Sequence, residues 1–320
     1  MPANDDPPSH EDPPTLDELL DLLGDDTRMA IVRALWERFD FSNYVTENRE
    51  GVPFGALREA AGVADSGNFN YHLGLLTGLL IERREDGYVL SPLGYNLMGA
   101  IDKYADYDYE TREPRVLADP CPLCDGDLLA EYRREIVAVR CVDCGGLADG
   151  GNFTFVELSN AGATDLAMDE MLDAATHSMF SKLRLSLDGT CWECYASPER
   201  TIRRCDDHQV QSNGLCQACD RRFASAITLR CPTCGTAGQG PLVEYALVTP
   251  AVAAFFDERG IGPTTVGPWQ YRLRALAVAD EQIPEGDPTT VHFSFDVGGD
   301  AVRVRITDQS DGITIDVERN

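Results

Sequence analysis

The cysteines constrain this 320-residue chain most strongly. All eleven lie between Cys121 and Cys234, and ten of them form five C-x-x-C pairs, at 121/124, 141/144, 191/194, 216/219 and 231/234. The eleventh begins the run Cys205-Asp206-Asp207-His208, a sixth pair with the same spacing. Clustered pairs of this kind indicate metal binding rather than disulfides. Eleven thiolates and one imidazole would complete three tetrahedral sites, so we expect zinc as the cofactor.

The first two pairs, Cys121-x2-Cys124 and Cys141-x2-Cys144, have the spacing of a zinc ribbon. Between them, residues 128–140 alternate as two strands of a hairpin, which would bring the second pair back to the first. We therefore predict a four-cysteine ribbon over residues 117–156. The alternative is a redox-active dithiol, but no thioredoxin-like βαβ pattern surrounds either pair.

The remaining pairs predict a Cys/His zinc module over residues 189–240 with two more ions. Its eight ligands are Cys191, Cys194, Cys205, His208, Cys216, Cys219, Cys231 and Cys234. Sequential, nested and crossed pairings all fit, and the crossed order resembles a RING-type module, although the gap after His208 is longer than usual there. Spacing does not choose among them. A fourth possibility is a single site from three pairs, with Cys205 and His208 binding no metal.

Closed sets of thiolate and imidazole ligands predict structural rather than catalytic zinc, because no position is left open for water. The segment 191–234 also carries six arginines against five acidic residues. The simpler interpretation is that these arginines offset the thiolate charge of the zinc centres. The alternative is a contact surface for DNA or RNA polymerase.

The excess of acidic over basic residues indicates a protein adapted to high salt. The chain has 54 acidic and 27 basic residues, a net charge of −27, and 43% apolar residues, which is typical of a folded protein. This balance resembles proteins of extreme halophiles, since molar salt shortens the Debye length to about 3 Å and screens repulsion. We expect residues 1–14, acidic and proline-rich, to be disordered. With no signal peptide and no apolar run long enough to span a membrane, we expect a cytoplasmic protein.

Residues 15–110 predict a winged helix-turn-helix domain. Helical periodicity marks segments beginning near Thr15, Asp26, Phe54 and Ser66, and a short turn at Gly62 separates the last two. Two strands then follow, 80–85 and 88–91, joined by Asp86-Gly87, which is a type I′ turn signal. A further helix begins at Pro92. A helix-turn-helix followed by a hairpin is the winged-helix arrangement.

The helix from Ser66 is the predicted recognition helix, and no charged residue occurs between Ser66 and Ile81. Asparagine suits adenine in the major groove, serine and tyrosine reach phosphates or base edges, and glycine permits close approach. In the wing, alternation lets at most one of two arginines follow the groove. The alternative for Asn70 and His72 is a capping or core role. The candidate DNA-binding residues are Ser66, Gly67, Asn68, Asn70, Tyr71, His72, Arg83 and Arg84.

Three runs carry a family resemblance: LLGDDTRMAIV at 22–32, DSGNFNYHL at 65–73 and DGYVLSPLG at 86–94. Over about residues 15–105 the chain resembles the winged-helix domain of ArsR-type transcriptional regulators of haloarchaea, and the rest resembles their longer, zinc-bearing members. The resemblance implies a homodimer on palindromic operators. Residues 1–120 contain no cysteine, so we do not expect arsenite sensing.

The rest of the chain predicts a helix and a small sheet. A helix over 163–188 repeats Met168, Leu172, Ala175, Met179 and Leu183 on one face, as a core stripe or a dimer seam. Residues 241–320 predict a small α/β domain: a helix over 250–259, then antiparallel strands at 269–279, 290–297, 301–306 and 313–317.

These observations predict an α+β protein that binds double-stranded DNA as a sequence-specific transcription regulator. The alternative is a zinc-ribbon protein-protein interaction module that acts on the transcription machinery. We do not expect an enzyme, because the chain lacks G-x-S-x-G, P-loop, H-E-x-x-H and Rossmann glycine patterns. We expect no membrane partner.

Overall fold

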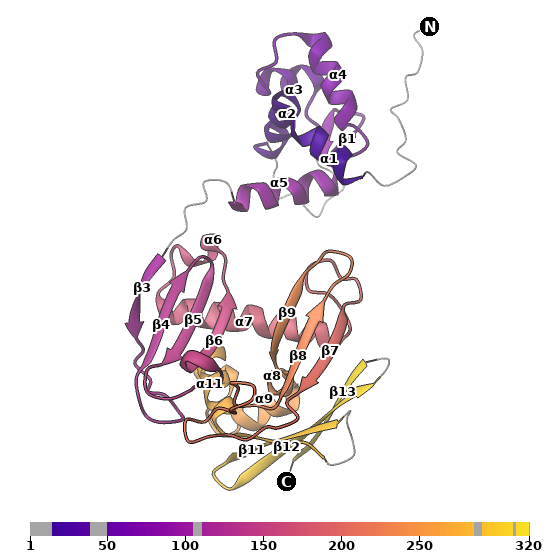
Figure 1. Ribbon diagram of the computed structural model, residues 1–320. Coiled ribbons are helices and arrows are strands. Elements are labelled where there is room, and N and C mark those ends of the chain that lie inside the picture. The colour runs from indigo at the N-terminus through magenta and orange to yellow at the C-terminus, as the bar shows by residue number, and fades with distance from the viewer. Residues whose placement is uncertain (1–14, 39–49, 105–110, 285–289, 310–311, 320) are drawn as a thin grey trace. The chain divides into compact units, whose positions relative to one another are not determined.

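The computed structural model describes residues 15–38, 50–104, 111–284, 290–309 and 312–319 (Figure 1). The chain forms two compact units, residues 1–107 and 108–320, called here the N-terminal and C-terminal units. Helices and several small sheets confirm the α+β class. The segment 1–14, expected to be disordered, lies outside the described residues.

The described residues of the N-terminal unit form five helices, and side chains cap the first turns of three of them. The Thr15 hydroxyl accepts a hydrogen bond from the Glu18 backbone N–H, the Asp25 carboxylate from that of Arg28, and the Asp65 carboxylate from that of Asn68. Such caps satisfy backbone donors that the helix leaves open. The helices are α1 (Leu16–Leu23), α2 (Asp26–Trp36), α3 (Phe54–Ala60), α4 (Ser66–Leu76) and α5 (Pro92–Tyr104).

The helix-turn-helix is formed by α3, the turn at Gly62 with φ of 69°, and α4. The inward face of α4 carries Phe69 and Leu73, both fully buried, and the Phe54 and Phe69 rings meet edge to face at 4.9 Å between centroids. Apolar periodicity therefore orients α4, leaving its polar face outward. A hairpin follows, so the winged helix-turn-helix is present.

The wing pairs β1 (Ile81–Arg83) with β2 (Tyr88–Leu90) in antiparallel register. The predicted type I′ turn at Asp86-Gly87 is wrong, because Arg84 and Gly87 exchange backbone hydrogen bonds at 2.8 and 3.4 Å around Glu85 and Asp86. Gly87 is needed for another reason. Val52 forms a bridge to Tyr88, and a Cβ on Gly87 would lie 2.4 Å from the Val52 carbonyl oxygen.

Two sheets of the C-terminal unit are built on zinc-ribbon hairpins. In each, a C-x-x-C pair precedes the first hairpin strand and a second pair follows the other strand. Adjacent strands are antiparallel throughout, in chain order. The four-stranded sheet contains β3 (Thr111–Val116), β4 (Leu128–Arg133), β5 (Ile136–Cys141) and β6 (Asn152–Glu157), and the three-stranded sheet contains β7 (Glu199–Arg204), β8 (Ser225–Arg230) and β9 (Ala237–Pro241).

Behind both ribbon sheets runs the long helix α7 (Met168–Leu187), and a third sheet lies below them (Figure 1). That sheet is four-stranded and antiparallel, with β10 (Ala279–Gln282), β11 (Thr290–Val297), β12 (Asp300–Gln309) and β13 (Gly312–Arg319). The short helices of this unit are α6 (Asn160–Ala163), α8 (Val243–Leu247), α9 (Pro250–Asp257), α10 (Pro263–Val266) and α11 (Pro268–Ala277).

The predicted strand over 269–279 is wrong, since these residues form helix α11 followed by the first residue of β10. Trp269, Tyr271, Leu273 and Ala275 alternate as in a strand, yet Arg272 and Leu276 are buried as well. A helix buried on most of its surface shows no single periodicity, so a short apolar run does not separate it from a strand. Pro268 begins this helix, where its missing N–H costs nothing.

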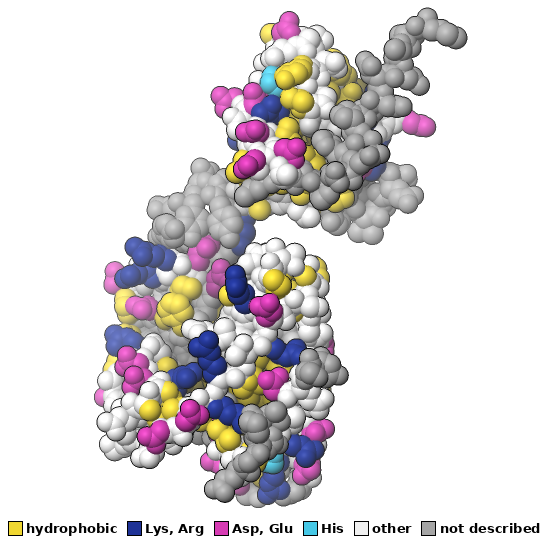
Figure 2. All heavy atoms as spheres, turned by 45° about the vertical axis from the view of Figure 1, so that its right-hand side comes forward, with side chains coloured by type: hydrophobic (Ala, Val, Ile, Leu, Met, Phe, Trp, Pro, Cys, Tyr) yellow, Lys and Arg dark blue, Asp and Glu magenta, His cyan; other side chains and the backbone are white. Residues whose placement is uncertain are grey.

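One hydrophobic core joins the segments that were predicted separately at 117–156, 163–188, 189–240 and 241–320. Tyr132, Met171, Phe223, Tyr245 and Phe293 belong to the same buried cluster. On α7, Met168, Leu172, Ala175 and Leu183 of the predicted stripe pack in this core, whereas Met179 does not, so the structure favours the core interpretation for four of the five residues. On the outside, acidic and basic side chains are interspersed over the face in Figure 2.

Candidate metal centres and nucleic-acid interface

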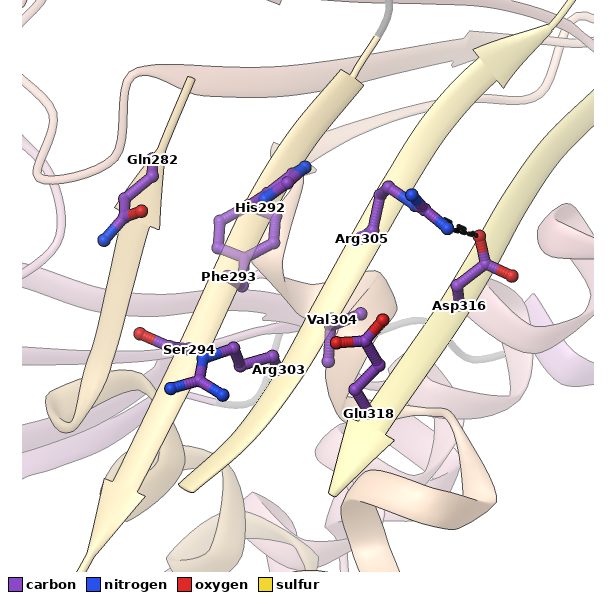
Figure 3. A pocket seen from close by; sticks show the side chains of 9 residues that line it. All are labelled: Gln282, His292, Phe293, Ser294, Arg303, Val304, Arg305, Asp316 and Glu318. Carbon is purple, nitrogen blue, oxygen red and sulfur yellow. Dashed lines mark hydrogen bonds and ion pairs between the residues drawn. The ribbon is translucent and has the colours of Figure 1, made fainter. Parts of the chain in front are cut away.

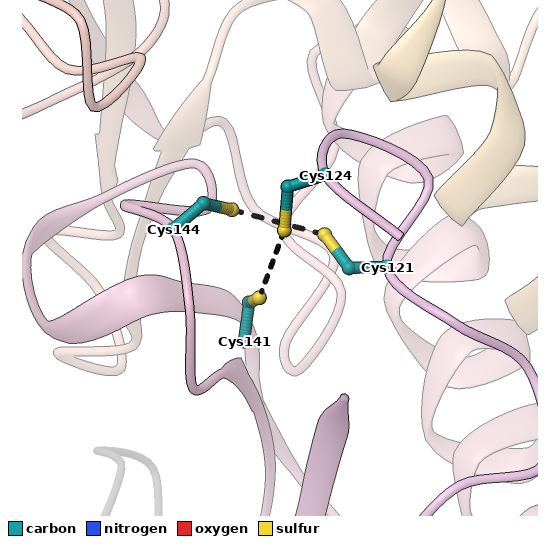
Figure 4. Close-up of side chains that lie close together, drawn as sticks. All are labelled: Cys121, Cys124, Cys141 and Cys144. Atoms are coloured by element: carbon teal, nitrogen blue, oxygen red, sulfur yellow. Dashed lines mark hydrogen bonds between the residues drawn. The ribbon is translucent and has the colours of Figure 1, made fainter. Parts of the chain in front are cut away.

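Four cysteines of the first ribbon converge at one point (Figure 4). The sulfurs of Cys121, Cys124, Cys141 and Cys144 all lie within 4.8 Å of one another. Cys121 Sγ is 3.8 Å from Cys144 Sγ, and Cys124 Sγ is 3.5 Å from Cys141 Sγ. A zinc–sulfur bond of about 2.3 Å in a tetrahedron gives sulfur–sulfur edges of about 3.8 Å. The group can therefore hold one metal ion.

A recurrent tight turn shapes the pairs. In the first, the Asp125 N–H donates to the Cys121 carbonyl and the Cys121 N–H donates to the Gly126 carbonyl, both at 2.8 Å. The residue after the second cysteine takes a positive φ, here 60° at Asp125. The same conformation occurs at Tyr195, Asp220 and Gly235, with φ of 62°, 52° and 78°. The turn aims two sulfurs toward one point.

The other eight ligands form two groups in nested order. Cys191, Cys194, Cys231 and Cys234 make one group, with sulfur–sulfur distances of 3.7 and 3.5 Å across the two pairs. Cys205, His208, Cys216 and Cys219 make the other. The crossed, RING-like order and the sequential order are therefore not adopted. The group also includes Cys205 and His208, which the single-site alternative left without metal.

His208 is oriented for ligation through Nδ1. That atom lies 3.6 Å from Cys219 Sγ, while Nε2 lies 3.0 Å from the carbonyl oxygen of Arg222. We assign the proton to Nε2, which then donates to the carbonyl, as is common for metal-binding histidines. In the second group, the Cys234 backbone N–H lowers the pKa of the Cys231 thiol to about 6. Such donors favour the thiolate form that binds metal.

The third ligand group is inserted into the turn of the second ribbon and contacts the first ribbon. Its loop lies between β7 and β8. Three backbone hydrogen bonds cross to the first ribbon: Gly145 N–H to the Asn213 carbonyl at 3.2 Å, Asp149 N–H to the Asp220 carbonyl at 3.0 Å, and Arg222 N–H to the Leu147 carbonyl at 3.0 Å. The third group thus ties the two ribbons together.

The candidate DNA-binding residues of α4 lie mostly on one outward surface. Ser66, Gly67, Asn68, Asn70 and Tyr71 are exposed, and the Tyr71 side chain is 63% exposed. In the wing, Arg83 is exposed, whereas Arg84 is partly buried and 3.7 Å from the Glu82 carboxylate. The structure therefore brings the uncharged α4 residues together on one exposed surface, and the wing follows α4 in the chain.

His72 points away from that surface. Its side chain is only 12% exposed, and its Nδ1 lies 3.5 Å from the Asp25 carboxylate, an ionic contact rather than a hydrogen bond. The Arg28 backbone N–H lowers the pKa of Asp25, and protonated His72 adds to this effect. The ionised Asp25 cap therefore favours folding above its unfolded pKa, and this contribution is lost as the pH falls through the lowered value.

The outer face of the C-terminal sheet carries a cavity of about 130 Å³ that was not predicted from the sequence (Figure 3). Two cross-strand rows line it, Gln282–His292–Arg305–Asp316 and Ser294–Arg303–Glu318. Arg305 forms an ion pair with Asp316 at 2.9 Å. The polar residues alternate with buried Phe293 and Val304, a period-2 signal visible in the sequence.

Comparison with known proteins separates the same two units. A family described as a domain of unknown function, DUF7351, matches residues 118–311, and a second domain of unknown function, DUF7347, matches residues 16–101. Neither the curated proteins nor the solved structures gave a match. Within the described ranges, no helix is both long and apolar enough to cross a membrane.

Proposed function

The chain belongs to the family defined by the domain of unknown function DUF7351, and we propose that it is a sequence-specific transcription regulator that binds double-stranded DNA. The observation that carries this proposal is the outward surface of α4, which is exposed, uncharged and next to a hairpin. In a winged helix, a helix so placed reads the major groove while the wing contacts its edge.

The chemistry of α4 suits base recognition more than phosphate binding. Asn68 and Asn70 carry amides that pair with adenine, and Tyr71 offers a hydroxyl beside an apolar ring. At Gly74, no atom lies within 4 Å of the position that a Cβ would take, so the backbone is open to close approach. In molar salt, counterion release adds little affinity, so direct contacts of this kind would dominate.

The C-terminal unit supports the regulator with three bound zinc ions. Four thiolates, or three thiolates and an imidazole, at tetrahedral distances are the donors that zinc prefers. Because protein ligands fill all four positions, each zinc ion would stabilise the fold and would have no position for a bound water. A homodimer in the cytoplasm, acting on a palindromic operator, is the assembly that the ArsR-type resemblance implies.

The deciding experiment substitutes Asn68→Ala together with Tyr71→Ala. We expect operator binding in a gel-shift assay to fall at least about thirtyfold, because two base contacts of about 1–3 kcal/mol each are lost. The operator fragments come from mapping crosslinked sites in cells. Zinc content should be unchanged.

Phe155→Ala is the matched control, since this aromatic side chain is also exposed but lies in the C-terminal unit. Unaltered binding by the double variant would remove α4 from the interface. A crosslinking signal that follows RNA polymerase instead of discrete sites would favour the protein-interaction alternative.

A further inference from the structure

The most exposed large apolar side chain of the described residues is Phe155 on β6, with 73% of its surface in solvent. Two residues earlier, Phe153 is buried. In a regular strand, residues two apart share one face. A β-bulge changes this: Val139 pairs with Thr154 and Arg140 with Asn152, which leaves Phe153 as the extra residue. The bulge therefore turns Phe155 to the outer face.

A buried ion pair holds this bulge. Arg272 Nη1 donates to the Phe153 carbonyl at 3.0 Å, and Arg272 Nε donates to the Glu244 carboxylate at 3.0 Å. The two charged side chains are 5% and 4% exposed. Burying such a pair is costly, and bulges often redirect side chains at functional sites. The fold thus places an aromatic ring in solvent by a specific internal contact.

The face of the four-stranded sheet that carries Phe155, called here the outer ribbon face, has apolar and cationic residues around the ring. By strand register, Ala138 lies directly beside Phe155, so the ring stands above a small neighbour. Val116, Leu129 and Ile136 extend the apolar area across β3, β4 and β5. Phe155, Ala138 and Ile136 are neighbours on this face by register, and an exposed apolar area of this kind is typical of a binding surface.

The charges of the outer ribbon face favour an anionic partner. Arg133 and Arg140 are exposed on β4 and β5. Glu157 is held by Lys182 at 3.4 Å, and Glu131 is half-buried beside Ala138. Lys182 belongs to α7 and neutralises Glu157, so Arg133 and Arg140 outweigh Glu131 on this face inside a chain whose net charge is −27.

We propose that the outer ribbon face binds single-stranded nucleic acid, with a base stacked on Phe155 and the backbone near Arg140 and Arg133. Exposed aromatic side chains on four-stranded antiparallel sheets stack unpaired bases, and arginine supplies phosphate contacts or a second stacking plane. A protein partner would bury the apolar side chains, but only an anionic partner such as a nucleic acid would also pair with Arg133 and Arg140. The surface is independent of α4, which reads duplex DNA.

The test measures the affinity of the full-length, zinc-loaded protein for fluorescent oligothymidylate and for oligouridylate in molar KCl, by anisotropy. Phe155→Ala should weaken binding about ten- to a hundredfold, the loss of one stacked base, and Phe155→Trp should retain it. Arg140→Gln should weaken binding and, in a titration from molar to lower KCl, reduce its salt dependence. Arg184→Gln on α7 is the control for charge, and Tyr71→Ala, at 63% exposure in the N-terminal unit, is the control for an exposed aromatic ring. Neither should change single-strand binding.

Three outcomes overturn the proposal: no binding by the wild-type protein, equal binding by Phe155→Ala, or a Phe155→Ala protein that only changes oligomeric state. The last would identify the face as an interface between copies of the chain. Failure of the duplex proposal is separate, because Asn68→Ala with Tyr71→Ala should leave single-strand binding intact and Phe155→Ala should leave operator binding intact.

Discussion

At the scale of single residues, Glu244 and Arg272 show how charge is used inside the C-terminal unit. Arg272 lies on α11, Glu244 on α8, and the Phe153 carbonyl that accepts from Arg272 begins the bulge of β6. One guanidinium thereby connects two helices and a strand. Because both charges are out of water, removing one partner leaves the other without compensation.

We predict that Glu244→Leu lowers the free energy of unfolding by about 3–5 kcal/mol, through the uncompensated Arg272. The double variant with Arg272→Met should recover much of that loss, since it buries no charge. Denaturant unfolding of the zinc-loaded protein at fixed salt measures both. Equal stability of the wild type and the single variant would show that the pair is not buried in solution.

At the scale of elements, the third ligand group acts as a clasp between ribbons. Its loop interrupts the second ribbon hairpin and bonds to residues 145–149 of the first. The two ribbons are otherwise alike, each with a pair before and after its hairpin. Nested pairing follows from this topology, because β7 and β8 bring 191/194 beside 231/234 and leave the inserted pairs to each other.

We predict that His208→Ala lowers zinc content from about three to about two ions per chain, because one tetrahedral set is incomplete. Amide exchange over residues 145–149 should accelerate as the clasp loosens. His177→Ala, an exposed histidine on α7, is the control. Three ions retained in the His208 variant, by elemental analysis, would exclude the histidine as a ligand.

At the scale of the whole molecule, the two units have separate cores, and every cysteine belongs to the C-terminal unit. The N-terminal core is closed by α4 and α2, with Phe69 and Ile31 fully buried. Metal binding is folding free energy for small zinc modules. We therefore expect the folding of the C-terminal unit, and not that of the N-terminal unit, to depend on metal.

We expect a strong chelator to unfold the C-terminal unit while the N-terminal unit stays folded. Hydrogen exchange followed by mass spectrometry should show lost protection across 118–311 and retained protection in α3 and α4. Restoring zinc should restore protection. Loss of protection in both units at the same chelator concentration would show that the N-terminal unit does not fold on its own.

Several features were predictable from the sequence because they are local. The spacing of Cys121 and Cys124 defines the tight metal-binding turn within five residues. The helical spacing of Phe69, Leu73 and Leu76 is enough to predict which face of α4 is buried. At Trp269 to Leu276 the apolar pattern fits both a strand and a helix, so the sequence was ambiguous. Burial on most sides by the surrounding core accounts for the helix that forms. The turn of the wing was also missed, because Gly87 responds to Val52, a residue distant in sequence.

The sequence by itself determined the winged-helix order, the twelve metal-ligand candidates and the uncharged surface of α4, because spacing and periodicity act over a few residues. Only the tertiary structure decided the nested pairing, the shared core of the C-terminal unit and the exposure of Phe155. Those depend on strand register and on one buried arginine that holds a bulge. Contacts between distant segments set them, and no short run of residues encodes such contacts.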